Sequence, residues 1–232
     1  MNVIITGASK GIGKAIAQAF AADGATLLLC ARNKEQLNAT VSSIQQQFPQ
    51  SAVYGRACDL SQKEDCLAFG AWCLEKGTPS VLVNNAGSYL PGNLYNEADE
   101  QLEQMIAVNL YSAYHLTRAV VPAMMAGEGG HIFNMCSIAS LDAYENGGSY
   151  SVSKFALAGF SKNLREELRP HRIKVTGIYP GAVMTDSWAG FDNSGKRIME
   201  AEDVAKLVMA ASRLSPQAVV EDIVLRPQLG DL

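Results

Sequence analysis

The stretch Thr6-Gly7-Ala8-Ser9-Lys10-Gly11-Ile12-Gly13 follows an apolar, β-rich run and precedes a helical pattern with Ile16, Ala19 and Phe20 on one face. Glycines at a strand-to-helix turn let the backbone approach a pyrophosphate, and the free N–H groups of the helix N-terminus stabilise that anion. The spacing is GxxxGxG instead of the commoner GxGxxG. The stretch predicts a dinucleotide site, and the alternative interpretation is a tight structural turn.

The rest of the chain repeats this strand-then-helix order. The β-rich runs are Asn2–Thr6, Ala25–Cys30, Ala52–Cys58, Ser80–Asn84, His131–Ser137, Ile173–Tyr179 and Ala218–Leu225. Most are continuously apolar, which is typical of strands covered on both faces. Between them lie helical patterns, such as the one that steps through Leu37, Val41 and Ile44 and stops at Pro49. The order predicts an α/β fold with a doubly wound parallel sheet, helices on both faces, and a single domain over residues 1–232.

Composition narrows the class of protein. The chain has 232 residues and a net charge of -4, which argues against nucleic acid or an anionic membrane as the main partner. Its apolar runs are shorter than the ~20 residues that span a bilayer. A strand-like run begins directly after Met1, so we expect no signal peptide and a cytoplasmic protein. The five cysteines lack a CxxC pair and there are three histidines, which predicts free buried thiols and no metal site.

The end of the second predicted strand indicates the type of cofactor. A fold that binds NAD usually carries an acidic residue there for the ribose 2′-hydroxyl. This chain reads Cys30-Ala31-Arg32-Asn33, and Lys10 in the glycine-rich turn can reach the same ribose. Two cations without a carboxylate suit a 2′-phosphate and so favour NADP(H). The alternative is that both are ordinary surface cations.

Two further strand ends carry polar residues. Cys58-Asp59-Leu60 places a carboxylate where it can accept from an adenine amino group, although Asp59 is also a good turn or cap residue. Ser61-Gln62-Lys63-Glu64 has the capping-box pattern and predicts the start of a helix. Asn84-Asn85-Ala86-Gly87 falls at the carboxyl edge of the sheet, where open α/β folds bind ligands. Turn chemistry alone is the alternative for these asparagines.

One predicted helix has a polar residue in its apolar stripe. The stripe is Leu102, Ile106, Asn109, Ala113, Leu116 and Val120, with steps of four and three. A buried amide costs free energy unless its hydrogen bonds are made. Asn109 must therefore bond to backbone, water or ligand, as a functional residue or as a satisfied core asparagine.

The stretch Tyr150-Ser151-Val152-Ser153-Lys154 holds a candidate proton-transfer pair. A tyrosine and a lysine at i and i+4 lie on the same face of a helix. A phenol with a pKa near ~10 is a poor acid or base at neutral pH, and a nearby cation lowers that pKa. Ser137, at a strand end thirteen residues earlier, points toward the same crevice. An ordinary exposed helical pair is the alternative.

The segment after the sixth predicted strand opens at the same edge. Tyr179-Pro180-Gly181-Ala182-Val183-Met184-Thr185 leads into a polar, glycine-containing stretch that includes Trp188 and Phe191. Aromatic residues in such a segment predict a lid over an apolar substrate, at residues 185–200. The alternative is a surface loop whose aromatic residues pack locally.

Together these residues resemble the short-chain dehydrogenase/reductase family over essentially the whole chain. The matching motifs are Thr6-Gly7-x-x-x-Gly11-x-Gly13, Asn84-Asn85-Ala86-Gly87, Asn109, Ser137, Tyr150-x-x-x-Lys154 and Pro180-Gly181. The resemblance implies a Rossmann-type seven-stranded sheet of order 3-2-1-4-5-6-7. It implies a catalytic tetrad of Asn109, Ser137, Tyr150 and Lys154. It also implies that NADP(H) is held by Gly7, Ser9, Lys10, Gly11, Ile12, Gly13, Arg32, Asp59, Leu60, Asn85, Ala86, Gly87, Tyr150, Lys154, Pro180, Gly181, Val183 and Thr185.

The mechanism that the resemblance implies is reduction of a carbonyl, with Tyr150 as general acid and Ser137 polarising the oxygen. Lys154 binds the nicotinamide ribose, and Asn109 holds a water that links Lys154 to solvent. The resemblance also implies a homodimer or homotetramer and, as a narrower activity, a 3-oxoacyl-(acyl-carrier-protein) reductase. Two other classes compete: an NADP(H)-binding sensor or scaffold without turnover, and a sugar-nucleotide epimerase or dehydratase, for which 232 residues leave little room.

Overall fold

The computed structural model describes residues 1–185, 188 and 190–231, and it contains a seven-stranded sheet of order β3-β2-β1-β4-β5-β6-β7. The strands are β1 (Asn2–Thr6), β2 (Thr26–Ala31), β3 (Val53–Ala57), β4 (Val81–Asn84), β5 (Gly130–Met135), β6 (Ile173–Pro180) and β7 (Asp222–Leu225). Every neighbouring pair is parallel. The predicted α/β class, strand order and strand positions are confirmed, with β7 beginning four residues later than the apolar run.

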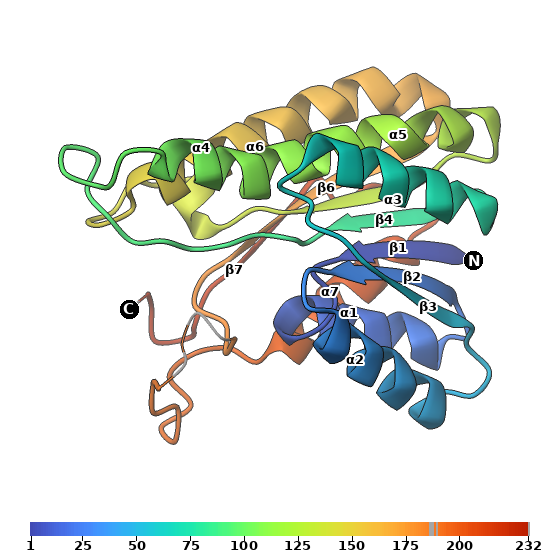
Figure 1. Ribbon diagram of the computed structural model, residues 1–232, viewed down its shortest axis with the longest axis horizontal. Helices are drawn as coiled ribbons and strands as arrows, with labels where there is room; N and C mark the ends of the chain where they lie inside the picture. Colours follow the sequence, from blue (N-terminus) through green and yellow to red (C-terminus); the bar gives the residue numbers. More distant parts are fainter. Residues whose placement is uncertain (186–187, 189, 232) are drawn as a thin grey trace.

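Helices cover both faces of the sheet (Figure 1). The helices are α1 (Gly11–Ala22), α2 (Lys34–Gln47), α3 (Lys63–Glu75), α4 (Gln101–Ile106), α5 (Ser112–Ala126), α6 (Gly148–Leu168) and α7 (Ala201–Ser212). One apolar layer joins the sheet to α1, α2 and α7, and the other joins it to α3, α5 and α6. Because both faces are covered, Val3, Ile4 and Ile5 of β1 are all fully buried, as their uninterrupted apolar run predicts.

The order of the strands reverses between β1 and β4, which is where a doubly wound sheet binds its ligand. Ile5 of β1 lies opposite Val83 of β4. The loops that follow these two strands therefore leave the sheet side by side. The carboxyl ends of the strands all face the left side of Figure 1.

The predicted helix through Asn109 is continuous but not uniform. A π-helical segment, η1 (Ala107–Tyr111), separates α4 from α5 and contains Asn109. The extra residue of a π-helical turn shifts the face that the preceding turns present. Leu102, predicted to lie on the apolar stripe, is accordingly 40% exposed, so the stripe is wrong at its N-terminal end.

The capping box predicted at Ser61 is also wrong. Helix α3 begins at Lys63, and its N-cap residue, Gln62, makes no side-chain capping bond. The polar groups of the turn are used differently, because Asp59 Oδ1 accepts from the Ser61 N–H at 3.0 Å. Asp65 Oδ2 in turn accepts from the Asp59 N–H at 2.8 Å. An Asx turn therefore replaces the capping box.

The thiols follow the prediction: Cys30, Cys66, Cys73 and Cys136 are buried, Cys58 is half-buried, and all five are free. Within the described ranges, no three His, Cys, Asp or Glu side chains group as a metal site would require. None of the helices in the described part of the chain is long and apolar enough to cross a membrane.

Candidate active site

A cavity of about 380 Å³ opens at the carboxyl ends of β1, β2, β3 and β4. Most of the residues predicted to hold a cofactor line it: Gly7, Ser9, Lys10, Gly11, Ile12, Arg32, Asp59, Leu60, Asn85, Ala86, Gly87 and Thr185. The lining also includes residues that the sequence did not single out, namely Cys30, Ala31, Asn33, Gln36, Cys58, Ser61 and Val108. Segments far apart in the chain thus build one site.

The glycine-rich turn is hydrogen-bonded to the segment that follows β4. Gly7 has φ +63°, a conformation that strains any residue with a β-carbon. The Asn85 side-chain amide donates to the Thr6 and Gly7 carbonyl oxygens at 2.9 and 3.2 Å. Thr6 Oγ1 accepts from the N–H groups of Asn85 and Ala86 at 2.9 and 2.8 Å. Gly13 lies in the first turn of α1 and packs against Gly7, so the turn and the N-terminus of α1 form one rigid unit.

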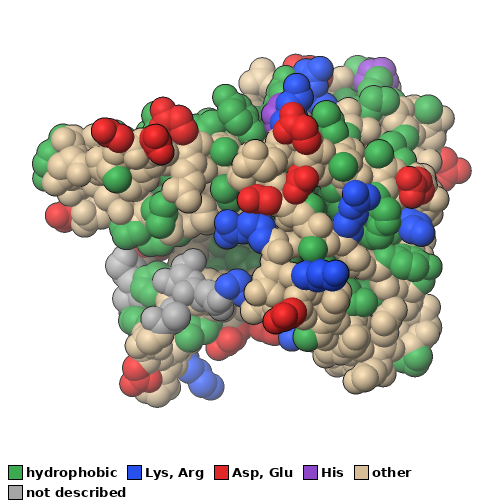
Figure 2. Space-filling model, viewed as in Figure 1, with side chains coloured by type: hydrophobic (Ala, Val, Ile, Leu, Met, Phe, Trp, Pro, Cys, Tyr) green, Lys and Arg blue, Asp and Glu red, His purple; other side chains and the backbone are tan. Residues whose placement is uncertain are grey.

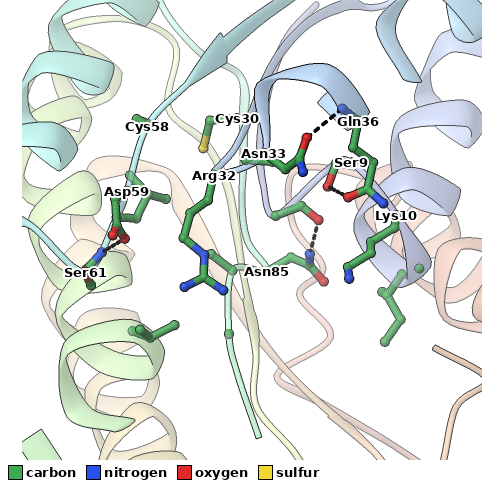
Figure 3. Close-up of a pocket in the computed structure, with 18 of the residues that line it drawn as sticks. Ser9, Lys10, Cys30, Arg32, Asn33, Gln36, Cys58, Asp59, Ser61 and Asn85 are labelled. Carbon is green, nitrogen blue, oxygen red and sulfur yellow. Dashed lines mark hydrogen bonds between the residues drawn. The ribbon is translucent and has the colours of Figure 1, made fainter. Parts of the chain in front are cut away.

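The cations predicted to select the cofactor both reach this cavity. Lys10 is the N-cap residue of α1, and Arg32 follows β2. Figure 3 shows their side chains extending toward the same opening from opposite sides. Gln36 lies on the Lys10 side of the opening, where its Oε1 accepts from Ser9 Oγ at 3.1 Å. The sequence feature that could have pointed to Gln36 is its position three residues after Asn33. The Asn33 side chain accepts from the Gln36 N–H at 2.9 Å and caps α2.

This donor set fits a dinucleotide with a 2′-phosphate. A glycine turn at a helix N-terminus suits the pyrophosphate, and two cations suit the additional phosphate. Asp59 lines the cavity, but its carboxylate already accepts from the Ser61 N–H. The turn interpretation of Asp59 therefore describes this structure, and an adenine contact would use its remaining oxygen.

The predicted proton-transfer residues meet beside the cavity. Lys154 is buried in α6, and its Nζ donates to the Met135 carbonyl oxygen at the end of β5, at 2.8 Å. The same Nζ lies 5.8 Å from the centre of the Tyr150 ring. Ser137 follows Met135, and its Oγ accepts from the Ala139 N–H at 3.2 Å. A β-carbon added at Gly87, in the cavity wall, would lie 3.5 Å from Lys154 Nζ, so the group adjoins the cavity.

The pKa of Tyr150 does not follow the sequence prediction. Burial raises it above its usual value, and a hydrogen bond with Ser137 opposes that rise. Burial also lowers the pKa of Lys154 to about 8. The expected lowering of the Tyr150 pKa is therefore wrong for this structure, because desolvation of the phenolate outweighs the influence of its neighbours. At neutral pH the phenol keeps its proton, which is the form that a general acid needs.

Asn109 is a buried amide, and both polar atoms of its side chain form hydrogen bonds within the protein. Its Oδ1 accepts from the Ser88 N–H at 2.8 Å, and its Nδ2 donates to the Ser88 carbonyl oxygen at 3.1 Å. The same Nδ2 donates to Ser153 Oγ, on α6, at 2.9 Å. Asn109 thereby fixes the backbone after Gly87 to the helix that carries Tyr150 and Lys154.

The segment after β6 returns to the cavity. Pro180 ends β6, and the Gly181 N–H donates to the Leu225 carbonyl oxygen at 2.8 Å. Val183 is buried and forms an isolated bridge with Met199, which closes the base of the intervening loop. Of the residues predicted in this segment only Thr185 lines the cavity, where its methyl group faces Gly11.

The predicted lid at 185–200 is only partly within the described residues, because residues 186, 187 and 189 lie outside them. The rings of Trp188 and Phe191 contact each other edge to face, with centroids 5.4 Å apart. Local packing of these aromatic residues is thus observed. In Figure 2 the molecule is hollowed between this loop and the layer that contains α4, and Lys and Arg side chains gather beside the hollow.

Comparison with known proteins identifies the class. The model of the short-chain dehydrogenase family matches residues 1–194. The chain therefore belongs to the short-chain dehydrogenase family, and it is an oxidoreductase with the Rossmann-type fold of that family.

Particular members are similar over nearly their whole lengths. An uncharacterized oxidoreductase of Staphylococcus epidermidis is 30% identical over 97% of this chain and 96% of its own. A metagenomic short-chain oxidoreductase solved in complex with NADP is 34% identical, with a TM-score of 0.86 over 98% and 97% of the two chains. An alcohol dehydrogenase of Thermococcus sibiricus, solved with 5-hydroxy-NADP, is 28% identical, with a TM-score of 0.92 over 100% and 98%.

Proposed function

We propose that this protein is an NADP(H)-dependent oxidoreductase that interconverts a carbonyl compound and the corresponding alcohol, with Tyr150 as the acid and base. The observation that carries the proposal is the meeting of Tyr150, Ser137 and Lys154 beside the cavity built on the glycine-rich turn. A proton donor, a second hydroxyl and a buried cation next to a dinucleotide-shaped site support hydride transfer.

The preference for NADP(H) rests on Lys10 and Arg32. Solved proteins of this fold carry NADP in some cases and NADH in others, so the family alone does not decide the cofactor. Both cations line the cavity, and the residue that follows β2 is Arg32 instead of an acid. Charge-assisted hydrogen bonds to a 2′-phosphate would use both side chains.

When bound, the reduced cofactor supplies a hydride to the carbonyl carbon. Tyr150 donates its phenolic proton to the carbonyl oxygen, and Ser137 donates a hydrogen bond to the same oxygen. Lys154 would hold the nicotinamide ribose and favour the phenolate once the proton has left. The side-chain amide of Asn109 forms hydrogen bonds with Ser88 and Ser153 and acts through them. Asn109 would also hold the water that connects Lys154 to solvent.

Other elements of the proposal concern the surroundings of the site. Residues 185–200 are proposed as the substrate lid, and Val183 and Thr185 as the contacts of the nicotinamide carboxamide. The helices around Asn109 and after Tyr150 are proposed to pair with those of a second copy. Exposed apolar side chains on these helices, including Tyr111, Val152 and Phe155, support a homodimer or homotetramer. A cytoplasmic location is also part of the proposal.

The test is Tyr150→Phe, which removes the proton donor and keeps the ring. We expect NADPH oxidation to fall by about 10³-fold or more, since acid–base groups contribute about 10²–10⁴-fold. NADPH binding, followed by the fluorescence of the cofactor, should stay within about twofold. The substrate panel comprises acyl thioesters, diketones, aldehydes and hydroxyketones, and the acyl thioesters test the narrower activity of a 3-oxoacyl-(acyl-carrier-protein) reductase.

Tyr54→Phe is the matched control, because Tyr54 is an exposed tyrosine on β3. It should keep full activity. An active Tyr150→Phe variant would contradict the proposal. Binding of NADPH with no turnover of any carbonyl by the wild-type protein would favour a sensor or scaffold.

A further inference from the structure

Two additional tyrosines surround the proposed acid. The ring of Tyr89 packs edge to face on the ring of Tyr150, with centroids 4.9 Å apart and an interplanar angle of 86°. Burial, together with the neighbouring phenols of Tyr89 and Tyr150, raises the Tyr144 pKa above its usual range. Tyr89 and Tyr144 remain 39% and 45% exposed. Both tyrosines thus lie near the proposed acid, and both are partly accessible to a ligand.

The loop that carries Tyr89 is anchored to the start of α6. The Glu97 carboxylate accepts from the Ser149 N–H at 3.1 Å and from the Ser149 hydroxyl. It also accepts from the Gln101 side-chain amide at 3.3 Å. Ser149 is fully buried and directly precedes Tyr150. The β4–α4 loop and the residue next to the proposed acid therefore share one carboxylate.

A second set of contacts anchors the segment that carries Tyr144. The Gly92 N–H donates to the Asn146 carbonyl oxygen at 3.0 Å, and the Asn146 N–H donates to Asn93 Oδ1 at 3.3 Å. Gly148 has φ +39°, and an added β-carbon would collide with the Gly92 carbonyl oxygen, so only glycine permits this approach. The backbone segments that carry the three tyrosines are therefore bonded to one another.

We propose that Tyr89 and Tyr144 are specificity-determining residues that select carbonyl substrates bearing a hydroxyl group on the carbon next to the carbonyl. The inference rests on the proposed function and names the substrate class of the same site. We expect a carbonyl oxygen bonded to Tyr150 and Ser137 to bring the adjacent carbon close to Tyr89, because the rings of Tyr89 and Tyr150 are in edge-to-face contact. A hydroxyl group there finds two phenols that both donate and accept.

The physical basis is a difference in hydrogen bonding between otherwise similar substrates. A substrate without the hydroxyl group displaces water from the tyrosine hydroxyls and returns no hydrogen bond. A site built to bond a substrate hydroxyl discriminates against the analogue that lacks it. Because these phenols are partly exposed, we expect each hydrogen bond to the substrate hydroxyl group to raise kcat/KM by about tenfold over the analogue that lacks it, the size typical of one hydrogen bond.

The experiment compares acetoin with 2-butanone, which differ by one hydroxyl group. The rates of NADPH oxidation give kcat/KM for both ketones with the wild-type protein, Tyr89→Phe and Tyr144→Phe. The wild type should prefer acetoin by at least about tenfold. Each variant should lose about tenfold in kcat/KM for acetoin and stay within about twofold for 2-butanone. Tyr95→Phe is the matched control, since Tyr95 lies on the same loop and is 85% exposed.

Affinity provides a readout that does not depend on turnover. In the Tyr150→Phe background with NADPH bound, acetoin should bind more tightly than 2-butanone, and adding both Tyr89→Phe and Tyr144→Phe should remove that difference. An unchanged substrate preference in both single variants, or equal kcat/KM values in the wild type, would overturn the inference while leaving carbonyl reduction in place. Reduction that persists in Tyr150→Phe would instead overturn the proposed function.

Discussion

A buried basic side chain lies at each end of the sheet, Lys154 of α6 at one end and His131 of β5 at the other. The surroundings of these two side chains differ. At the carboxyl ends of the strands, burial lowers the pKa of Lys154 to about 8. At the amino ends, burial lowers the pKa of His131 to about 3. His131 Nε2 bonds Thr176 Oγ1 at 2.7 Å, and its ring stacks on Phe133 with centroids 3.9 Å apart. A shifted pKa therefore occurs at both ends.

What distinguishes Lys154 is its position. It adjoins the wall of a cavity of about 380 Å³, and its neighbours Tyr150 and Ser137 are partners of the kind that proton transfer needs. His131 is enclosed by the Thr176 hydroxyl group of the neighbouring strand β6 and by the Phe133 ring of its own strand β5. A perturbed pKa marks a candidate functional residue only when the group also reaches a place where a ligand can bind.

Of the substitutions that test this difference between the two ends, Lys154→Met has the largest expected effect. We expect kcat/KM for carbonyl reduction to fall by about 10²–10³-fold, because the buried cation beside Tyr150 is lost. Lys174→Met is the control at the other end of the sheet, where Lys174 Nζ donates to the carbonyl oxygens of Leu214 and Ser215. It should leave kcat/KM within about twofold. Equal losses in the two variants would contradict the difference between the two ends.

Lys154→Met should also change how the free energy of unfolding depends on pH. The pKa of Lys154 lies near 8 in the folded protein and at its usual 10.5 in the unfolded chain. Between these values the unfolded chain binds more protons, so the free energy of unfolding rises with pH, by on the order of 3 kcal/mol in total. This rise should be absent from the variant. Urea unfolding of wild type and variant at pH 7 and pH 10 measures the difference.

A smaller effect is expected at the cofactor end of the cavity, from Arg32→Ala and Lys10→Ala. Each should raise KM for NADPH by about 10–100-fold, the size of a hydrogen bond to a charged group, with little change for NADH. Lys34→Ala is the control, because Lys34 begins α2 close to Arg32 and is exposed. A tight preference for NADH in the wild-type protein would contradict the assignment of both cations.

The sequence predicted the fold well because its signals are local. Continuous apolar runs indicate strands covered on both faces, and the steps of Leu37, Val41 and Ile44 indicate a helix that ends before Pro49. The glycine-rich turn followed directly from the strand before it and the helix after it. These patterns do not depend on contacts between distant segments.

What the sequence did not predict depends on such contacts. The π-helical turn at Asn109 is fixed by bonds to Ser88 and Ser153, which lie 21 and 44 residues away. The direction of the Tyr150 pKa shift depends on burial, which only the assembled site provides. Tyr89 and Tyr144 form no motif with Tyr150 in the sequence, and only the anchored loops bring them together.

The smallest expected effect lies at the amino end of the sheet, in His131→Asn, and it is confined to stability. The pKa of His131 is about 3 in the folded protein and 6.5 when unperturbed, so the unfolded chain takes up a proton first as the pH falls. Between pH 7 and pH 5 the wild type should therefore lose about 2 kcal/mol of unfolding free energy through this residue. The asparagine variant should not show this loss, and its kcat/KM at pH 7 should match the wild type. Thr176→Val, which removes the partner hydroxyl but keeps the titrating ring, should lower stability at both pH values and retain the loss between them. A fall in kcat/KM for His131→Asn as large as that for Lys154→Met would show that both buried bases serve the reaction, and would remove the distinction between the two ends of the sheet.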